Sequence, residues 1–314
     1  MADFQPGEVV QGRYEVQRLL GRGGMGMVYL VLDYETQNLL ALKTLLPQYV
    51  SNERALQRFN REINACRRLN HPAIVKIFDA QHEGSLVFFT MEYIEGKSLR
   101  KWMQQRGKLG IGSTVRIISL LCDALAHAHQ FTIHRDLSPD NVMVLSDGSI
   151  KLLDFGLAKI TDADDGLTRI GVSLGKMQYN SPEQRASAKE VDYRTDIYAI
   201  GIMFFEMLTG QVPKREQKPT DIRPDIPKSC DEFYLKAAAY NPADRFQSVV
   251  EIPVFLNNIY NESTGSVPTA PPHRRQEAEA AAAAAAGQQD GAPTSMFDRI
   301  RGFFVSLFSQ RSSG

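Results

Sequence analysis

The spacing of apolar residues changes along the chain from a strand-like to a helix-like pattern, and this change is the strongest constraint on the fold. Alternating or continuous apolar runs bounded by turn residues are typical of strands, whereas recurrence every three or four residues is typical of helices. Strand-like runs lie in the first third of the chain, at 13–21, 27–33, 39–46, 76–80 and 85–93. Helical spacing is found at 52–70, 114–129, 195–208 and 231–240. A strand-rich first third followed by a helix-rich remainder predicts two lobes.

Composition restricts the class of protein further. Of the 314 residues, 43% are hydrophobic, which is enough for a sizeable core. The 36 basic residues balance 36 acidic ones, so nucleic acid is not expected as a partner. The three cysteines form no CxxC pair, which predicts neither a zinc site nor a disulfide frame and favours a reducing, cytoplasmic setting. No signal peptide is expected in MADFQPGEVV, and no apolar run is long enough to predict a transmembrane helix.

The globular pattern ends near residue 260. The stretch 261–295 is rich in proline, alanine, glycine and polar residues, a composition that buries too little apolar surface to offset the entropy of ordering, so we expect a low-complexity linker. The stretch 296–314 is apolar again and predicts a short amphipathic segment that contacts a membrane surface or a partner protein, or folds back on the domain. Its apolar side consists of Phe297, Ile300, Phe304, Leu307 and Phe308.

The stretch GRGGMGMV contains Gly21, Gly23, Gly26 and Val28 in a GxGxxGxV frame. Glycines let backbone amides approach phosphate oxygens, because no Cβ stands in the way. Dinucleotide-binding folds use a similar motif, but there the glycines open a helix. Here MVYLVL follows and predicts a strand, which favours a glycine-rich hairpin over a nucleotide. A tight turn without a ligand is the alternative for the motif in isolation.

Further polar residues follow in an order suited to phosphoryl chemistry. Lys43 ends a strand-like run and Glu62 lies between apolar positions of a helical pattern, so the two could form an ion pair that holds the lysine against phosphates. Taken singly, each would more commonly be a solvated surface residue. HRDLSPDN supplies Asp136 and Asn141, and LLDFGLA supplies Asp154. Asn141 and Asp154 offer the oxygen ligands that suit magnesium, and Asp136 could accept or orient a hydroxyl proton.

These motifs, in this order, resemble those of the bacterial eukaryotic-like (Hanks-type) serine/threonine protein kinases. The resemblance covers about residues 14–256, roughly three quarters of the chain. It implies an α+β, two-lobed protein-kinase fold, with a small antiparallel-sheet N-lobe that carries one helix and a larger, mainly helical C-lobe. The kinase domain is expected at 13–260, with the N-lobe at about 13–92 and the C-lobe at about 95–260.

The resemblance implies ATP and Mg²⁺ as ligands and a role for each matching residue. Gly21, Gly23 and Gly26 would cover the ATP phosphates. Lys43, held by Glu62, would contact the α- and β-phosphates.

The chemical step is assigned in the same way. Asp136 would be the catalytic base or the hydroxyl-orienting group, and Asn141 and Asp154 would hold magnesium. Asp196 would brace the catalytic loop from below. Met91 would guard the back of the adenine pocket. The remaining adenine contacts would be the backbones of Glu92 and Ile94 and the side chains of Val28, Ala41 and Met143.

Three departures from the family pattern concern recognition and charge. The family commonly has a lysine, which meets the γ-phosphate, where this chain has Ser138, and a threonine where this chain has Lys176. We therefore expect Lys176 to supply the missing positive charge, because charge stabilisation does not depend on one backbone position. The alternative is a solvated Lys176 and a weak or inactive enzyme. The third departure is a short stretch after LTGQVP, where the family has a substrate-docking helix.

An arginine, Arg135, precedes Asp136, and in the family such an arginine meets a phosphate on the activation loop. The loop spans about 154–183 and contains Thr161, Thr168 and Ser173, of which Thr168 and Ser173 are the candidates for autophosphorylation. Ordinary loop hydroxyls are the alternative.

The leading hypothesis is an ATP-dependent Ser/Thr protein kinase that phosphorylates protein substrates and, through self-association, itself. A nucleotide-binding pseudokinase or scaffold with weak or no transfer is the alternative. A small-molecule kinase is a weaker possibility, because SPE at 181–183 and Arg245, which is expected to pair with Glu183, resemble the protein kinases.

Overall fold

The computed structural model describes residues 4–23, 26–83, 86–155, 177–186 and 191–265. The chain divides into two compact units, Met1–Val267 and Pro268–Gly314. The described residues all belong to the first unit. They include 261–265, the start of the predicted linker, where the last helix of the domain continues to Thr264, beyond the expected boundary at 260. The rest of the predicted linker and the C-terminal amphipathic segment lie outside the described residues, and their boundaries stay predictions.

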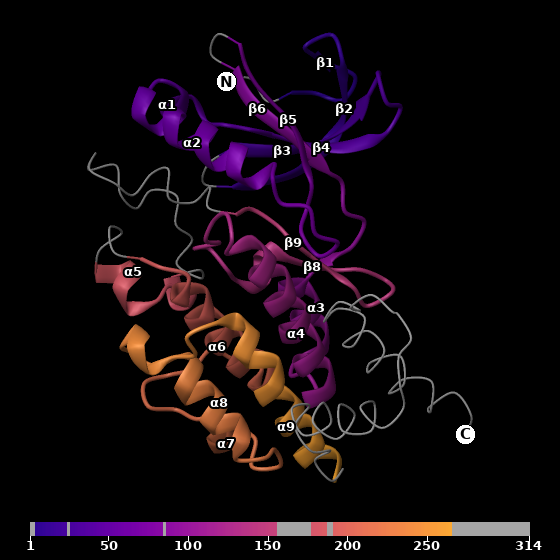
Figure 1. Cartoon of the computed structure of the whole chain (residues 1–314). Helices are drawn as coiled ribbons and strands as arrows, with labels where there is room; N and C mark the ends of the chain where they lie inside the picture. The colour runs from indigo at the N-terminus through magenta and orange to yellow at the C-terminus, as the bar shows by residue number, and fades with distance from the viewer. Residues whose placement is uncertain (1–3, 24–25, 84–85, 156–176, 187–190, 266–314) are drawn as a thin grey trace, which may run out of the picture. The chain divides into compact units, whose positions relative to one another are not determined.

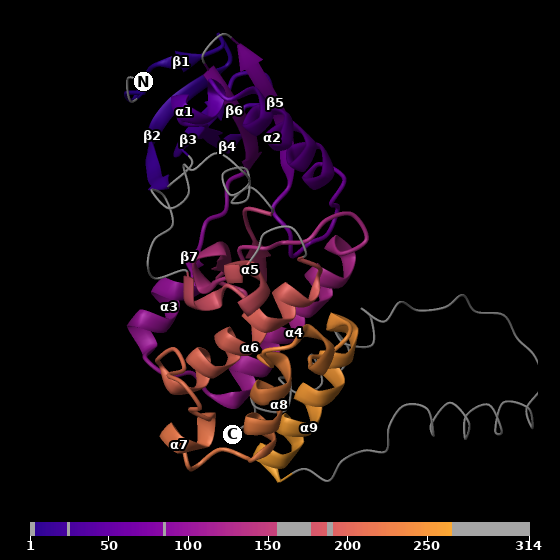
Figure 2. The same ribbon diagram turned by 90° about the vertical axis from the view of Figure 1, so that its left-hand side faces the viewer.

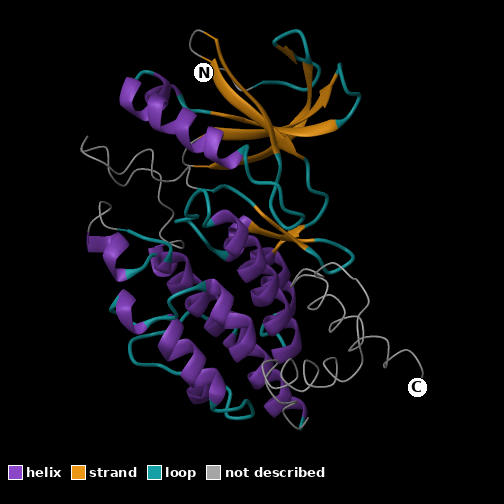
Figure 3. Ribbon diagram, viewed as in Figure 1, coloured by secondary structure: helices purple, strands orange, loops and turns teal. Residues whose placement is uncertain are grey.

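The N-lobe is a six-stranded antiparallel sheet with the strand order β1-β2-β3-β4-β6-β5 (Figure 1). Its strands are β1 (Val9–Val10), β2 (Tyr14–Gly23), β3 (Gly26–Asp33), β4 (Leu39–Thr44), β5 (Ile77–Glu83) and β6 (Leu86–Glu92). A short helix, α1 (Pro47–Val50), leads into the predicted one, α2 (Glu53–Cys66), and the two helices lie beside the sheet (Figure 3). The five predicted strands are all present, and β1 adds a sixth.

The apolar side of α2 explains how the helix is held. Phe59, Ile63 and Cys66 recur at helical spacing and are buried, and the ring centroid of Phe59 lies 5.9 Å from that of Phe89 in β6. Burying an apolar side chain of this size stabilises the fold by about 2 kcal/mol. Of the polar positions between them, Asn60, Arg61 and Asn64 are exposed and Glu62 is half-buried, so the helix is amphipathic in the way its sequence predicts.

The C-lobe is mainly helical (Figures 1 and 2). Its long helices are α3 (Leu99–Arg106), α4 (Ile111–Ala128), α6 (Arg194–Thr209), α8 (Ser229–Ala237) and α9 (Ile252–Thr264). Its short helices are α5 (Pro182–Ala186), α7 (Pro219–Ile222) and the 3₁₀ turns Pro139–Asn141, Met177–Tyr179, Pro242–Asp244 and Val249–Glu251. Nearly all of α6 is buried, and α4 packs against both α6 and α9.

A small antiparallel sheet, β7-β8-β9, lies at the top of the C-lobe. It consists of β7 (Lys97–Ser98), β8 (Val142–Val144) and β9 (Ile150–Leu152). These strands and α3 were not expected from the apolar pattern. Between α6 and α8 the structure has only the four-residue α7, in keeping with the short stretch noted in the sequence.

Among the described residues, α4 alone is long and apolar enough to pass a length and hydropathy test for a membrane span. More than half of it, 56%, is buried inside the domain. This is the behaviour of a core helix, so the test is weak evidence for a span.

Candidate active site

Lys43 lies on β4, one of the two middle strands of the N-lobe sheet. In the strand register it stands opposite Val28 of β3 and Phe89 of β6, and its ammonium lies 6.0 Å from the centroid of the Phe89 ring. Its Nζ donates a 2.8 Å hydrogen bond to Oδ1 of Asp154. The fold thus brings together two predicted site residues that are 111 positions apart in the sequence.

Glu62 lies on α2 and is half-buried. Among the described residues no ion pair joins it to Lys43, whose ammonium contacts Asp154 and the Phe89 ring instead. The predicted Glu62–Lys43 pair therefore stays a prediction.

The segment that carries Asp154 is fixed to both lobes. Asp154 has a positive φ of 55°, a conformation that is uncommon outside glycine and that persists where surrounding contacts impose it. The next residue, Phe155, is buried with its ring 4.7 Å from that of His134, and its carbonyl accepts a hydrogen bond from Sγ of Cys66 on α2, at 3.7 Å. Burial, reinforced by the nearby charges of Glu62 and Asp154, raises the pKa of the Cys66 thiol to about 12, so the thiol is a donor near neutral pH.

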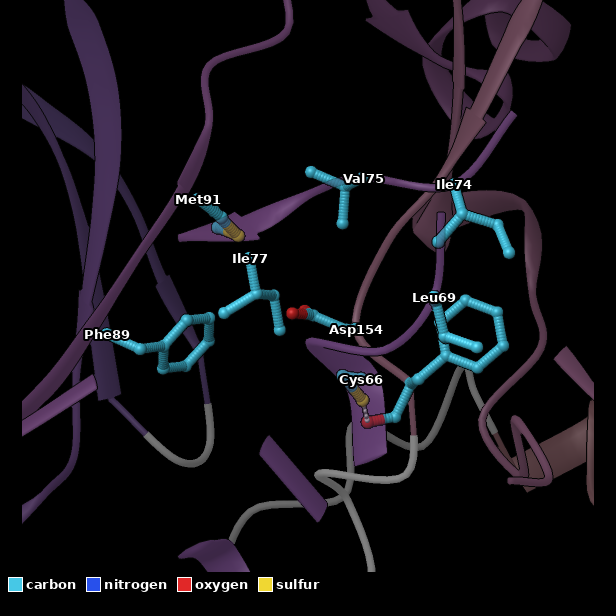
Figure 4. A pocket seen from close by; sticks show the side chains of 9 residues that line it. Cys66, Leu69, Ile74, Val75, Ile77, Phe89, Met91 and Asp154 are labelled. Carbon is cyan, nitrogen blue, oxygen red and sulfur yellow. Dashed lines mark hydrogen bonds between the residues drawn. The ribbon is translucent and has the colours of Figure 1, made fainter. Parts of the chain in front are cut away.

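A small cavity lies behind Met91 (Figure 4). Its volume is about 10 Å³, which is enough for about one water. In Figure 4 the Asp154 carboxylate and the side chains of Ile77 and Met91 face the same space. Its lining residues are Cys66, Leu69, Ile74, Val75, Ile77, Phe89, Met91, Asp154 and Phe155. Met91 and Phe89, which stand opposite Ala41 and Lys43 in the strand register, therefore both line this cavity.

The loop before Asp136 is held by one buried carboxylate. The backbone amides of His134 and Arg135 donate to Oδ2 and Oδ1 of Asp196, at 2.9 and 2.8 Å, and Nε2 of His129 lies 2.9 Å from Oδ2. Burial by itself raises the pKa of Asp196, but the hydrogen bond and charge of His129 and the other donors outweigh it, and the pKa is lowered. Arg135 has a positive φ of 65°, which this grip on its amide helps to maintain.

Asp136 and Asn141 contact each other directly. Nδ2 of Asn141 donates to the backbone carbonyl of Asp136 at 2.7 Å and to its Oδ2 at 2.9 Å. The amide of Asp136 lies 3.3 Å from Nδ1 of His134, whose Nε2 is 2.8 Å from the Leu153 carbonyl, next to Asp154. One hydrogen-bonded chain therefore links Asn141 and Asp136 to the backbone carbonyl of Leu153, the residue before Asp154.

Ser138 is the position where the family commonly has lysine. Its side chain is buried, and its hydroxyl is one of four buried side-chain groups without a hydrogen-bond partner among the described residues. An unpaired buried hydroxyl costs about 1–3 kcal/mol, so this environment calls for a partner. Lys176 lies outside the described residues, as do Thr161, Thr168 and Ser173.

The glycine motif forms the hairpin between β2 and β3, as predicted. Gly21 pairs with Val28, and Gly23 pairs with Gly26. A Cβ at Gly26 would lie 1.6 Å from the carbonyl oxygen of Thr44, so only glycine fits against β4. The tip of the hairpin, 24–25, lies outside the described residues.

The chain crosses from one lobe to the other after β6. The Glu92 amide donates to the Lys76 carbonyl at 2.9 Å, and its carboxylate accepts from Nζ of Lys151 at 2.7 Å. Ile94 is half-buried, and no hydrogen bond of its amide is found among the described residues.

The predicted adenine-contacting side chains come from both lobes. Ala41 of β4 stands opposite Leu30 and Met91, on the same sheet face as Val28. Met143 lies in β8, and a Cβ at Gly96 would lie 2.9 Å from the carbonyl oxygen of the next residue, Val144, so glycine lets the chain pass close to β8.

The predicted pair of Glu183 and Arg245 is present. Nη1 and Nη2 of Arg245 donate to the two carboxylate oxygens of Glu183, at 2.7 and 2.8 Å. The guanidinium is fully buried and also donates to the carbonyls of Ala239, Arg194 and Tyr240. Burial raises the pKa of Glu183 and the Arg245 hydrogen bond lowers it, with a lowered pKa as the net result.

Oxygen ligands for a metal are limited in this site. In the part of the chain that the structure describes, no three His, Cys, Asp or Glu side chains gather in a way that could hold a metal ion. A carboxylate and an amide oxygen, from Asp154 and Asn141, are hard ligands of the kind magnesium takes when phosphate and water complete its shell. The donor set therefore fits magnesium better than zinc, which takes three or four nitrogen or sulfur ligands.

Sequence reasoning missed a partly buried polar cluster beside Asn141. It consists of Arg100, Asp140, Tyr179 and Glu206. The four residues belong to separate segments without a common motif, so the sequence carried no signal for it.

Comparisons with known proteins support the same fold and family. A family model described as a protein kinase domain matches residues 14–258. Serine/threonine-protein kinase pkn3 of Myxococcus xanthus is 38% identical over 77% of this chain and 49% of its own length. Serine/threonine-protein kinase PknB of Mycobacterium tuberculosis is 35% identical over 82% of this chain and 44% of its own length. The chain thus spans about half the length of these curated relatives, or less.

A solved structure extends the comparison to three dimensions. The crystal structure of the Mycobacterium tuberculosis PknI kinase domain superposes with a TM-score of 0.68 at 31% identity. The match covers 82% of this chain and 100% of that domain. The two-lobed α+β fold predicted from the sequence is confirmed.

Proposed function

This chain belongs to the protein kinase family, with bacterial serine/threonine kinases among its relatives, and on that premise we propose that it transfers the γ-phosphoryl group of ATP to serine or threonine hydroxyls of proteins. The observation that carries the proposal is the hydrogen-bonded chain from Asp136 through His134 to the backbone beside Asp154, with Lys43 on Asp154. It brings the proposed base Asp136, the Asp154 carboxylate and the Lys43 ammonium together at one place, as phosphoryl transfer requires.

Asp136 is the proposed catalytic base or hydroxyl-orienting group. Its carboxylate receives the amide of Asn141, which fixes its direction, and Asp196 holds the two residues before it by their backbone amides. A carboxylate held in this way accepts or orients a substrate hydroxyl without reorganising during the reaction.

Asn141 and Asp154 are the proposed magnesium ligands. When bound, magnesium would offset the negative charge of the triphosphate. We further propose that Lys43 turns from Asp154 towards the α- and β-phosphates, with Glu62 of α2 as its new partner. In the same proposal Gly21, Gly23 and Gly26 cover the phosphates.

The adenine ring is placed between the lobes in this proposal. Val28 and Ala41 would contact it from the N-lobe sheet and Met143 from β8, with Met91 at the back. The Glu92 carbonyl and the Ile94 amide would form hydrogen bonds with its edge. Two observations support this: the Glu92 amide already donates to the Lys76 carbonyl, and no hydrogen bond of the Ile94 amide is found among the described residues.

The charge missing at Ser138 is proposed to come from Lys176. The buried Ser138 hydroxyl, without a partner among the described residues, is an acceptor suited to an ammonium group. Lys176 would then reach across the site and bring its ammonium to the Ser138 hydroxyl and the γ-phosphate.

Arg135 is proposed to bind a phosphate on Thr168 or Ser173 after autophosphorylation between two copies of the chain. Its buried Nε has no hydrogen-bond partner among the described residues, which supports this proposal. Charge-assisted hydrogen bonds from a guanidinium to phosphate order such loops.

Labelling with γ-³²P-ATP tests the proposal, with and without a generic protein acceptor. We expect wild-type protein to label the acceptor and itself, with mass spectrometry placing the self-label on Thr168 or Ser173. Asp136→Asn should lower transfer by about a thousandfold, within the range of general base catalysis, and still bind nucleotide. ATP binding without any transfer by wild type would favour the pseudokinase alternative.

The kinase domain is compatible with a cytoplasmic location, and we propose that 296–314 adds contact with a membrane surface or a partner protein. Its apolar helical side, quoted above, supports this proposal.

A further inference from the structure

The outer face of the N-lobe sheet, opposite the face of Val28 and Ala41, carries a small core of its own. Its members are Val10, Tyr14, Val16, Met27, Tyr29, Val31, Leu40, Leu42 and Phe88. The side chain of Phe4 packs against this core from the N-terminal segment. Met27 and Tyr29 alternate with Val28 along β3, so their side chains lie on the outer face. Phe4 therefore lies behind the strand that follows the glycine motif.

A chain of hydrogen bonds runs through this core from the N-terminal segment to the glycine-rich hairpin. The backbone amide of Phe4 donates to the Tyr29 hydroxyl at 3.3 Å, and that hydroxyl donates to Sδ of Met27 at 3.2 Å. The rings of Phe4 and Tyr29 meet edge to face, with their centroids 5.5 Å apart. Tyr29 is fully buried and Met27 is nearly so, so little water competes for these bonds.

Met27 immediately follows Gly26, and both residues are held at the base of the hairpin. On the β4 side, the Met27 amide and carbonyl each lie 3.4 Å from the Thr44 hydroxyl, and Gly26 packs directly against the Thr44 carbonyl. On the outer side, Tyr29 holds the Met27 thioether. The base of the hairpin is therefore held from two sides, next to the point where Gly23 pairs with Gly26.

A glycine-rich segment depends on such neighbours for its position. Glycine has no side chain to pack and loses more conformational freedom on ordering than any other residue. A hairpin whose base is fixed in advance presents its amides to a phosphate at a lower entropic cost.

We propose that Tyr29 is a positioning residue for the nucleotide: together with Phe4 and Met27 it forms an outer brace that holds the glycine-rich hairpin over the ATP phosphates. The proposal rests on the proposed kinase function. Tyr29 acts through Met27 and Gly26, because its own side chain lies on the outer face. The hairpin holds the phosphates equally before and during transfer, so loss of the outer brace weakens nucleotide binding without slowing the bound complex.

Tyr29→Phe removes one oxygen from the outer brace and keeps the ring. We expect the KM for ATP and the dissociation constant of ADP to rise about fivefold, equivalent to about 1 kcal/mol, the net contribution of a typical hydrogen bond. The kcat at saturating ATP should stay within about twofold of wild type. The affinity for adenosine should also stay within about twofold, because adenosine has no phosphate for the hairpin to cover.

Tyr14→Phe is the matched control. Tyr14 is equally buried in the same core, but it stands opposite Asp33, at the end of β3 away from the hairpin. Loss of its hydroxyl should therefore change the affinities for ADP and adenosine by less than about twofold. An equal weakening of ADP binding in Tyr14→Phe and Tyr29→Phe would indicate a general loosening of the N-lobe and would overturn the proposal.

Met27→Leu separates positioning from stability. It removes the sulfur that accepts the Tyr29 hydroxyl, so the Tm should fall, whereas the double variant with Tyr29→Phe removes both polar partners and should recover most of the Tm. The KM for ATP should stay raised in the single and the double variant alike. If the KM recovered together with the Tm, the contact would act on stability alone, contrary to the proposal.

The N-terminal end of the outer brace is tested by two variants of Phe4. Phe4→Pro removes the ring and the amide donor, whereas Phe4→Ala removes the ring and keeps the donor, so the proline variant should bind ADP more weakly than the alanine variant. Adding Tyr29→Phe to Phe4→Pro should weaken ADP binding little further, because both changes break the same chain of bonds. A full multiplication of the two effects, to about 25-fold, would show that the residues act separately and that no brace exists.

Binding of ADP also separates this proposal from the kinase proposal, since it is read whether or not phosphate is transferred. Wild type that binds ADP but transfers nothing, together with weaker ADP binding by Tyr29→Phe, would count against the kinase function alone. Unchanged ADP binding by Tyr29→Phe in an enzyme that transfers phosphate would overturn the outer brace alone. Wild type that binds no ADP would overturn both.

Discussion

Asp196 shows how a single carboxylate organises the backbone around the candidate active site. It lies on buried α6 and receives the amides of His134 and Arg135 and the ring of His129. Each bond to an ionised group contributes about 1.5–3 kcal/mol, so together they outweigh the cost of burying the charge. The residue therefore acts on Asp136 without touching it.

At the same scale, the pair of Ser138 and Lys176 yields a test of charge relocation. Lys176→Ala should lower turnover at saturating ATP by about a hundredfold, equivalent to about 3 kcal/mol of lost charge stabilisation. Adding Ser138→Lys to that variant should restore most of the loss, because it returns a cation to the position where the family commonly has one. Single-turnover kinetics measures both, and a rate for Lys176→Ala equal to wild type would end the idea.

Asp33 yields a prediction on acid stability. The hydrogen bond from Arg13, 2.6 Å from Nε to Oδ1, lowers the pKa of Asp33 from 3.8 to about 2. A carboxylate whose pKa is lower in the folded state stabilises the fold at any pH above its unfolded-state pKa. This stabilisation is lost as the pH falls through the folded-state pKa. The contribution, about 2 kcal/mol, is therefore complete above about pH 5 and declines from about pH 4 towards pH 2.

Urea unfolding of Asp33→Asn and wild type between pH 6 and pH 3 measures this contribution. The difference in unfolding free energy should be largest at pH 6 and should narrow towards pH 3. Glu35→Gln is the control: Glu35 also pairs with Arg13, at 2.6 Å, but its side chain is 67% exposed, so we expect an effect below about 1 kcal/mol. A difference that does not depend on pH would rule out the Asp33 carboxylate as its source.

Single-residue contacts differ in how far the sequence reveals them. Asp136, Asn141 and Asp154 can be identified from the sequence because each lies in a short motif, HRDLSPDN or LLDFGLA, whose other residues mark its position. The partner of Lys43 cannot be identified in this way, because Glu62 and Asp154 are both carboxylates in suitable motifs. Which of the two pairs with Lys43 depends on where α2 lies in three dimensions.

Among the elements, length decides what the sequence reveals. The 18 residues of α4 and the 16 of α6 give the apolar pattern room to repeat, and both helices were predicted within a few residues. By contrast, β7 has two residues and β8 and β9 have three each. These strands exist because distant segments pair, as Ser98 does with Met143, so their own sequence carries almost no period.

The contact between α5 and Arg245, the residue after the 3₁₀ turn Pro242–Asp244, leads to a stability prediction. Arg245→Lys keeps the charge but loses the planar fork that serves Glu183 and three backbone carbonyls. We expect a loss of about 3 kcal/mol, the cost of leaving buried partners unsatisfied, and a Tm lower by about 10 °C.

Calorimetry and denaturant unfolding check this value. Arg215→Lys, at a side chain that is 94% exposed, should change the unfolding free energy by less than about 0.5 kcal/mol and serves as the control. Equal stability of the two variants would mean that the fork geometry of Arg245 is not what holds α5.

At the scale of the whole molecule, the two-lobed arrangement was readable from the order of strand-like and helical patterns. The surroundings of Arg100 were not, because they combine α3, the 3₁₀ turns Pro139–Asn141 and Met177–Tyr179, and α6. Such a site exists only after the C-lobe has assembled.

The C-terminal segment leads to a prediction at this scale. Deletion of 296–314 should leave phosphoryl transfer to a peptide unchanged and reduce co-sedimentation with vesicles that contain anionic lipid by at least about tenfold, because the apolar helical side would be lost. Phe304→Asp in the full chain should have the same effect, and Arg311→Ala, outside the apolar side, should not. Equal sedimentation of all variants would point to a protein partner or to docking on the domain.

The thiol contact between Cys66 and the Phe155 carbonyl would constrain any movement of α2 that brings Glu62 to Lys43, as proposed above. If that contact is kept, the helix swings about its C-terminal end while Asp154 stays in place. Glu62 lies four residues from this fulcrum and Glu53 thirteen, so about 6 Å and about 20 Å along the axis. A swing that carries Glu62 by 1 Å towards Lys43 would thus carry the start of the helix by about 3 Å, which makes Glu53 the more sensitive place for a distance label.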